Sequence, residues 1–184
     1  MIRPIYLYGA EVLRKNAAPA NLEDRDGLAA LVQDLKDTLV TADGCGLAAP
    51  QIGVSLRVVI VDGDVVSDTY EYLKGFRRTL INPEVLEESP EQTTYSEGCL
   101  SIPGIYCDIE RPKKIKVRYY NEDLVQITEE FDNFASRMIQ HELSHLDGDL
   151  FTDHAAPIRK KMLSSKLQNI SKGKVHPHYN SKLR

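Results

Sequence analysis

The segment from residue 141 to residue 145 reads His-Glu-Leu-Ser-His, a pattern typical of hydrolytic metal sites. His141 and His145 are four residues apart, so on a helix both imidazoles lie on one face and can bind the same ion. Glu142 lies where a carboxylate can accept a proton from metal-activated water. Two surface histidines on an amphipathic helix are the simpler alternative. Phe134 and Met138 continue the same core-facing stripe, and this favours a metal because buried imidazoles need partners.

A third protein ligand is expected elsewhere, because catalytic metal sites commonly combine three side chains with a water. No histidine or glutamate follows His145 at the spacing of familiar zinc proteases. Cys99 is the best candidate, since it lies in Glu97-Gly-Cys-Leu-Ser101 at the end of an expected strand, where small residues would expose the thiol. A lone cysteine is otherwise more often a small buried apolar residue.

The elements that must position these side chains indicate an α+β fold. Helices are expected at 24–42, 131–146 and 157–170, with Asp132 as a possible N-cap of the second. Strands are expected between them, and a turn at 121–123 predicts a hairpin. Because β and α segments do not alternate, we expect antiparallel sheets packed around a central helix that carries the two histidines, followed by a C-terminal helix. The expected strands are 57–61, 79–82, 85–89, 92–98, 105–110, 114–120 and 124–130.

The composition is that of an ordinary globular protein, with 184 residues, 42% apolar residues and a net charge of −4. We expect one catalytic domain over 1–170 and a basic, flexible tail over 171–184. No apolar run predicts a membrane span or a secretory signal, so a cytoplasmic protein is expected. Three cysteines in such a protein argue against a disulfide framework.

The charge is distributed unevenly along the chain. All 27 acidic residues lie before residue 154, and the following segment has 8 Lys/Arg. The acidic body argues against specific DNA binding, whereas the basic end could contact a polyanion or simply be solvated.

Three segments resemble the three motifs of the peptide deformylase family, in the same order and with similar spacing. They are Gly44-Cys-Gly-Leu-Ala-Ala-Pro-Gln-Ile-Gly53, Glu97-Gly-Cys-Leu-Ser101 and Gln140-His-Glu-Leu-Ser-His145. With the opening Pro4 to Arg14, the resemblance covers about residues 1–170. It implies that the protein removes the formyl group from the N-terminal formylmethionine of nascent polypeptides and releases formate. The alternatives are a zinc endopeptidase, which has the same histidine pattern, and a structural metal site in a binding module.

The resemblance also implies a role for each catalytic residue. Cys99, His141 and His145 would bind one divalent metal ion, with a metal-bound hydroxide as the nucleophile. Glu142 would act as general base and then as general acid. The Gln51 side chain and the Leu100 N–H would donate hydrogen bonds to the developing oxyanion. The family uses Fe²⁺ natively and accepts Zn²⁺, Ni²⁺ or Co²⁺.

Further residues are assigned to the substrate and to the surroundings of the metal. Backbone groups of Cys45, Gly46 and Gly98 would pair with the peptide, and Gly44 and Gly46 would allow positive φ and close approach. A methionine pocket would be lined by Cys45, Tyr95, Phe134, Arg137, Met138 and His141, with the Arg137 guanidinium at its rim. Glu97 would support the site, with Arg111 as its partner. Ser144 stands where the family usually has an acid, and Cys45 where it usually has an aliphatic residue.

Finally, the resemblance implies a contact between the C-terminal helix and the ribosome. Basic residues cluster on or near that helix, at Arg159, Lys160, Lys161 and Lys166. Phosphate contacts of this kind weaken steeply with salt.

Overall fold

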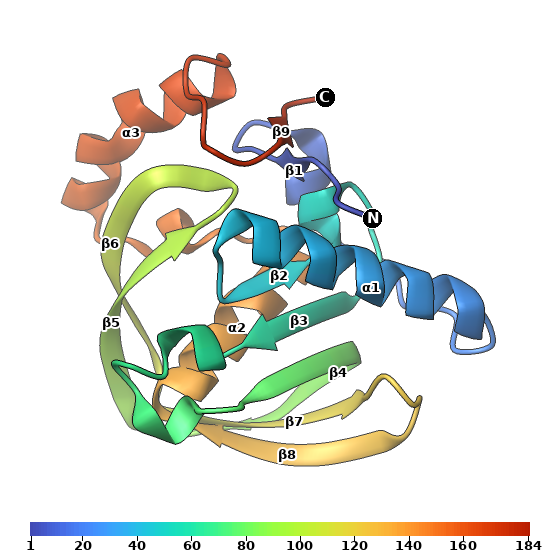
Figure 1. The fold of residues 1–184 in the computed structure, drawn as a ribbon. Coiled ribbons are helices and arrows are strands. Elements are labelled where there is room, and N and C mark those ends of the chain that lie inside the picture. Colours follow the sequence, from blue (N-terminus) through green and yellow to red (C-terminus); the bar gives the residue numbers. More distant parts are fainter.

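The computed structural model describes residues 1–184 and has the expected α+β architecture (Figure 1). One five-stranded antiparallel sheet has the order β2-β3-β4-β7-β8, and β5 pairs with β6 in a separate antiparallel hairpin. The helices are α1 (Arg25–Ala42), α2 (Asn133–Leu146) and α3 (Pro157–Ser171). The strands are β1 (Ile5–Tyr6), β2 (Gly46–Ala48), β3 (Val58–Asp62), β4 (Arg77–Glu88), β5 (Gln92–Cys99), β6 (Ile102–Pro112), β7 (Lys114–Tyr120), β8 (Gln126–Asp132) and β9 (Ser181–Lys182).

The strand β3 is buried on both faces, which explains its uninterrupted apolar sequence. Val59 and Val61 belong to the core that α2 covers, whereas Val58 and Ile60 belong to the core that α1 covers. Alternate residues of a strand point to opposite faces, so α1 and α2 lie on opposite sides of the sheet. This arrangement buries α2 in the middle of the molecule.

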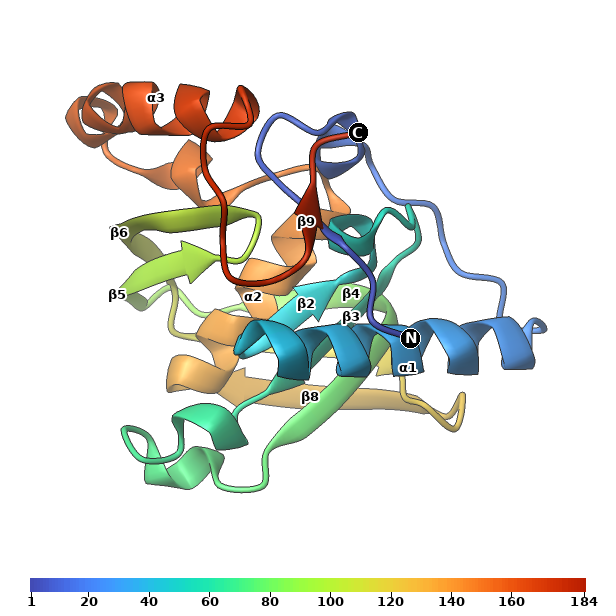
Figure 2. The same ribbon diagram turned by 45° about the horizontal axis from the view of Figure 1, so that its top comes forward.

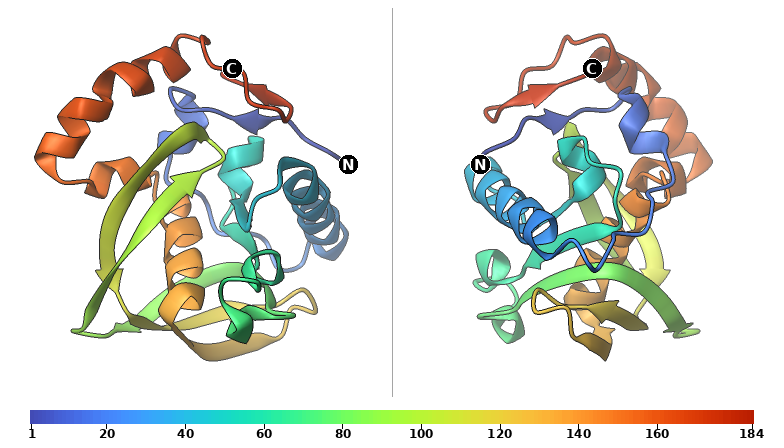
Figure 3. Two further views of the ribbon diagram at one scale, coloured as in Figure 1. Left: turned by 60° about the vertical axis from the view of Figure 1, so that its left-hand side comes forward. Right: turned by 90° about the vertical axis from the view of Figure 1, so that its right-hand side faces the viewer.

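The β5–β6 hairpin lies on the other side of α2 from the five-stranded sheet (Figure 3). The apolar side chains of β6, among them Ile102 and Ile105, pack with Phe151 and with Leu163 of α3 in a third core. The expectation of antiparallel sheets around a central helix is therefore confirmed. The end of β5 and the last turns of α2 meet at one place.

Several element boundaries differ from the sequence prediction, and β1, β2 and β9 are strands that it did not include. Phe131 and Asp132 belong to β8, and α2 begins at Asn133, because Phe131 is needed in the core of the sheet. Asp132 is the N-cap as expected, with Oδ1 accepting the Asn133 N–H at 2.7 Å. The strands expected at 79–82 and 85–89 form one strand, β4, whose pairing with β7 contains two register shifts.

The segment expected to be a flexible tail folds back over the molecule (Figure 2). Gly173, at a left-handed φ of 75°, lies just beyond α3, and the chain then returns to pair β9 with β1 in parallel. Asn180 and Lys182 accept hydrogen bonds from the backbone N–H groups of Ile5 and Leu7, each at 2.9 Å.

No helix has the length and apolar character that a membrane crossing requires.

Candidate active site

The three expected metal ligands come together from two elements. His141 and His145 lie on α2, and Cys99 is the last residue of β5. The pairing of β5 with β6 shifts by bulging between Gly98 and Cys99, and such a shift re-aims a side chain. One ligand atom from each residue lies within 4.8 Å of the other two.

The geometry of this group fits one divalent metal ion. The Cys99 Sγ atom is 3.4 Å from Nε2 of His145, close to the roughly 3.6 Å that tetrahedral coordination by sulfur and nitrogen gives. Nδ1 of His141 contacts Glu97 at 2.9 Å, so its Nε2 remains for an ion. A thiolate and two imidazoles are donors that Zn²⁺ and Fe²⁺ accept.

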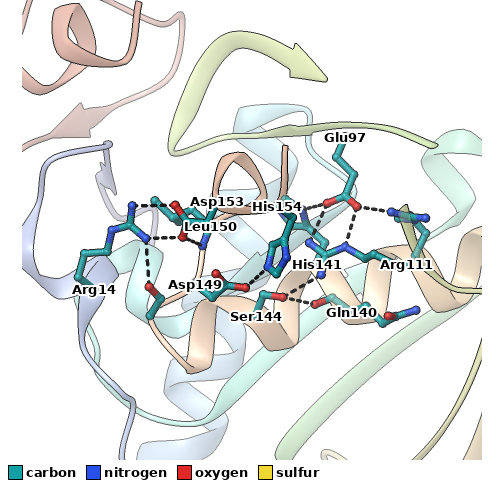
Figure 4. A network of polar contacts seen from close by, with 12 residues as sticks. Arg14, Glu97, Arg111, Gln140, His141, Ser144, Asp149, Leu150, Asp153 and His154 are labelled. Carbon is teal, nitrogen blue, oxygen red and sulfur yellow. Dashed lines mark hydrogen bonds and ion pairs between the residues drawn. The ribbon is translucent and has the colours of Figure 1, made fainter. Parts of the chain in front are cut away.

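Glu97 and two arginines form a buried ionic cluster, and Glu97 contacts His141 at Nδ1, the ring nitrogen that does not face the ion site (Figure 4). Glu97 is 5% exposed and accepts hydrogen bonds from Arg111 at 2.7 and 3.1 Å and from Arg137 at 2.5 Å. Burial raises the pKa of Glu97, but hydrogen bonds from His141 and Arg111 outweigh it and hold the pKa far below its usual range. The carboxylate is therefore charged, and it orients the imidazole of His141.

The position of Arg137 corrects the sequence interpretation. Its side chain lines the cavity, but the guanidinium is buried and not at the pocket rim. It binds Glu97 and the carbonyl oxygens of Ile109 and Thr93 at 2.8 and 2.6 Å. Arg111 also donates to the Ser144 hydroxyl at 3.1 Å, so the serine joins the same cluster although it has no charge.

The Glu142 carboxyl lies beside the ligands on the inner face of α2. Glu142 is 5% exposed, and its Oε2 atom has no hydrogen-bond partner. A Cβ atom on Gly46 would lie 2.6 Å from Glu142 Oε1, so only glycine leaves room for the carboxyl. Burial raises the pKa of Glu142 to about 7, which suits a group that takes and returns a proton near neutral pH.

Neither Gly44 nor Gly46 has a positive φ, contrary to the expectation from the sequence. The left-handed residue of this loop is Asp43, the C-cap of α1, with φ 57°. The two glycines are needed for close approach: a Cβ at Gly44 would lie 2.7 Å from a methyl carbon of Leu100.

Gln51 lies in a short 3-10 helix, Ala49–Ile52, that follows β2 directly. Its Oε1 atom accepts the Ala48 N–H at 2.9 Å, which fixes the amide orientation. Its Nε2 donates to the Ser101 hydroxyl at 3.1 Å and points toward Cys99 Sγ at 3.5 Å. The Gln51 amide and Leu100 thus lie at the same edge of the metal-ligand group.

A cavity of about 550 Å³ connects these groups with most of the expected substrate residues. Tyr95 does not line it, but packs behind Phe134 with ring centroids 5.3 Å apart. Burial raises the pKa of the Cys45 thiol to about 12, which disfavours a reactive thiolate. The lining includes Cys45, Gly46, Gln51, Glu97, Gly98, Cys99, Leu100, Phe134, Arg137, Met138, His141 and Glu142.

Sequence reasoning missed several residues around the cavity. Ser101 holds the Gln51 amide, and Pro177, His178 and Tyr179 of the C-terminal segment line the cavity. Ser101 is the last residue of the Glu97-Gly-Cys-Leu-Ser101 motif, so the sequence does contain a signal for its place in the site. The C-terminal segment has no such pattern in the sequence.

Known proteins are similar to this chain over most of its length. The profile of the family described as polypeptide deformylase matches residues 2–161. The peptide deformylase of Cytophaga hutchinsonii is 42% identical over 99% of this chain and 97% of its own length, and that of Flavobacterium psychrophilum is 42% identical over 100% and 97%.

Solved structures show the same similarity. A peptide deformylase structure from Legionella pneumophila is 34% identical, with a TM-score of 0.81 over 95% of this chain and 98% of the other. One from Plasmodium falciparum is 31% identical, with a TM-score of 0.83 over 92% and 95%. The structural match thus covers 92–95% of this chain. The chain therefore belongs to the polypeptide deformylase family of enzymes.

Proposed function

We propose that this protein hydrolyses the formyl amide at the N-terminus of formylmethionyl polypeptides and releases formate. The observation that carries the proposal is the cluster of Cys99, His141 and His145, of which Cys99 and His141 line the same cavity as the buried Glu142. A divalent ion bound by these ligands would lower the pKa of water and polarise the formyl carbonyl.

Glu142 is the group that moves the proton. Its unpartnered Oε2 can accept a hydrogen bond from the attacking water, and a pKa of about 7 lets the carboxyl take the proton and release it again. The acceptor of that proton is the amine of methionine, which leaves as the C–N bond of the formyl amide breaks. Glu142 therefore acts first as base and then as acid.

Gln51 and Leu100 stabilise the charge that develops on the formyl oxygen. The Gln51 Nε2 group already faces Cys99, because Ala48 fixes the other end of the amide. The backbone N–H of Leu100 follows the metal ligand directly in the chain. Loss of one such donor typically costs about 2.7–4 kcal/mol of barrier.

The methionine side chain occupies the part of the cavity lined by Phe134, Met138 and Cys45. Tyr70 stacks on Phe134 with ring centroids 4.4 Å apart and supports this ring, although Tyr70 itself does not line the cavity. Main-chain groups of Cys45, Gly46 and Gly98, which line the cavity, pair with the peptide.

Fe²⁺ is the native ion that we propose, with Zn²⁺, Ni²⁺ or Co²⁺ able to replace it. The Cys99 thiolate would then be exposed to oxidation, because ferrous iron and thiolate sulfur both react with oxygen. Metal analysis after anaerobic purification should find iron, and mass spectrometry after exposure to air should find oxidised Cys99. Stoichiometric zinc with an unmodified thiol in both preparations would contradict iron.

The substrate emerges from the ribosome, so we place the activity in the cytoplasm and propose that α3 contacts ribosomal RNA. Four basic side chains lie on this helix: Arg159, Lys160, Lys161 and Lys166. The helix has no acidic residue, which suits a phosphate-rich partner.

The direct test is formate release from a short formyl-Met peptide, measured anaerobically with metal-loaded protein. We expect release by the unmodified protein and a loss of roughly 10²-fold to 10⁴-fold in kcat for Glu142→Ala. The variant should keep its metal, because Glu142 is not a ligand. No release from protein with stoichiometric metal would refute the proposal, and cleavage of internal peptide bonds would point to an endopeptidase.

A further inference from the structure

The C-terminal segment forms one side of the catalytic cavity, although it lies outside all three motifs. Pro177, His178 and Tyr179 line the same cavity as Cys99 and Glu142. The chain reaches this position by running back from α3 to β9, which is paired with β1 (Figure 2).

The segment is attached to two loops that line the cavity. The Tyr179 hydroxyl donates to the Leu100 carbonyl at 2.5 Å, and burial raises the pKa of this hydroxyl above its usual value. In addition, Nε2 of His178 lies 3.4 Å from Asp43, the C-cap of α1. Each contact joins the segment to a loop that also lines the cavity.

Residues 177–179 line a different part of the cavity from Phe134, beside which we place the methionine side chain. Phe134 is in the first turn of α2, on the side of residues 64–73, whereas the C-terminal segment lies at the other end of the molecule (Figures 1 and 3). The ligands Cys99 and His141 also line the cavity. With the formyl group at the metal ligands and the methionine side chain beside Phe134, the peptide that follows the methionine is the part of the substrate left to contact residues 177–179.

The surface at this end is mainly apolar and aromatic. Leu100, Pro103 and Tyr106 lie there with Pro177 and Tyr179, and Tyr106 is 64% exposed. The imidazole of His178 and the carboxylate of Asp43, which also lie at this end, contact each other. Aromatic and proline faces favour apolar or aromatic partners.

We propose that residues 177–179 are a specificity-determining wall of the cavity, which contacts the residues after formylmethionine and favours large apolar or aromatic side chains there. The inference rests on the proposed deformylation. Tyr179 supplies the contact face, and its hydroxyl bond to Leu100 holds the wall in place.

The test compares formyl-Met-Phe-Phe with formyl-Met-Ala-Ala in steady-state kinetics of the metal-loaded full chain. The unmodified protein should favour the aromatic peptide, mainly through KM. Tyr179→Ala should reduce this preference roughly threefold to tenfold, the value of one aromatic contact. Tyr179→Phe keeps the ring but loses the bond to the Leu100 carbonyl, so its preference should lie between those of the unmodified protein and Tyr179→Ala. Inhibition by the deformylated product Met-Phe-Phe should weaken in parallel, which measures binding without the reaction.

A neighbouring residue provides the matched control. His176 is exposed and does not line the cavity, so His176→Ala should leave the preference unchanged, whereas His178→Ala should reduce it. Should Tyr179→Ala fail to fold, His178→Ala and Pro177→Ala still test the wall.

Two results would overturn the inference while leaving deformylation intact. One is an equal preference in the unmodified protein and in all wall variants. The other is an equal fall in kcat for both peptides, which would mean that Tyr179 only supports Leu100. Failure of the proposed function looks different, since neither peptide would then release formate.

Discussion

Replacing Glu97 by alanine removes the single carboxylate that two buried guanidinium groups share. Arg111 and Arg137 are 8% and 3% exposed, and both ion-pair with Glu97. Arg137 keeps its carbonyl partners in the variant, but neither cation keeps an anion. A buried charge without its counter-ion is strongly destabilising.

The expected loss of stability follows from this geometry. Breaking a buried ion pair costs about 3–5 kcal/mol. For a chain of 184 residues this corresponds to a fall in Tm of roughly 6–20 °C. Glu97 also holds Nδ1 of His141, and loss of such an orienting partner typically weakens metal binding by roughly 10-fold to 100-fold.

The measurements are thermal unfolding of the metal-free protein and metal content after dialysis. Glu84 provides a control, because its ion pair with Arg118 is exposed and should contribute at most about 1 kcal/mol. Glu97→Gln should lie between, since an amide can accept a hydrogen bond but carries no charge. Equal unfolding temperatures for Glu97→Ala and Glu84→Ala, with equal metal retention, would refute the reasoning.

Three further predictions follow from other parts of the structure. Gly46→Ala should displace the Glu142 carboxyl and lower kcat at least tenfold with bound metal retained; an unchanged rate would contradict the close contact. Burial raises the pKa of Glu129, but hydrogen bonds from Arg78 and Tyr119 lower it overall. Stability is therefore lost as pH falls below the ordinary carboxyl range, and chemical unfolding of Glu129→Gln should show a weaker loss. Lys160→Glu with Lys161→Glu should reduce co-sedimentation with ribosomes at low salt, and no difference would remove the proposed contact.

The central part of the site was predictable because its signals are local. The four-residue spacing of His141 and His145 determines that both face one side of α2, whatever surrounds the helix. Asp132 is the last residue of the preceding strand, and its side chain caps that helix. An aspartate just before a helical segment is a signal that can be read in the sequence alone. These features need no knowledge of distant residues.

The environment of Arg137 was not predictable in the same way. A long cation on the pocket face of a helix has the same sequence signature whether its end reaches water or a buried carboxylate. Its partner Glu97 is 40 residues earlier, on a strand of the other sheet. Only the packing of the β5–β6 hairpin on α2 decides between the two positions.

The path of the C-terminal segment shows a different limit of sequence interpretation. Residues 171–184 contain four basic residues and few large apolar ones, a composition that predicts a solvated tail. These residues are attached to β1 through backbone hydrogen bonds, which almost any sequence can form. The attachment therefore cannot be predicted from the composition. Tyr179 is the exception, because its hydroxyl needs the Leu100 carbonyl as a partner in that position. The chemical groups on α2 and β5 are therefore positioned by the core, whereas the proposed wall depends on a short backbone pairing and one side-chain bond. Substitutions in this segment should change which peptides bind much more than how the bound formyl group reacts.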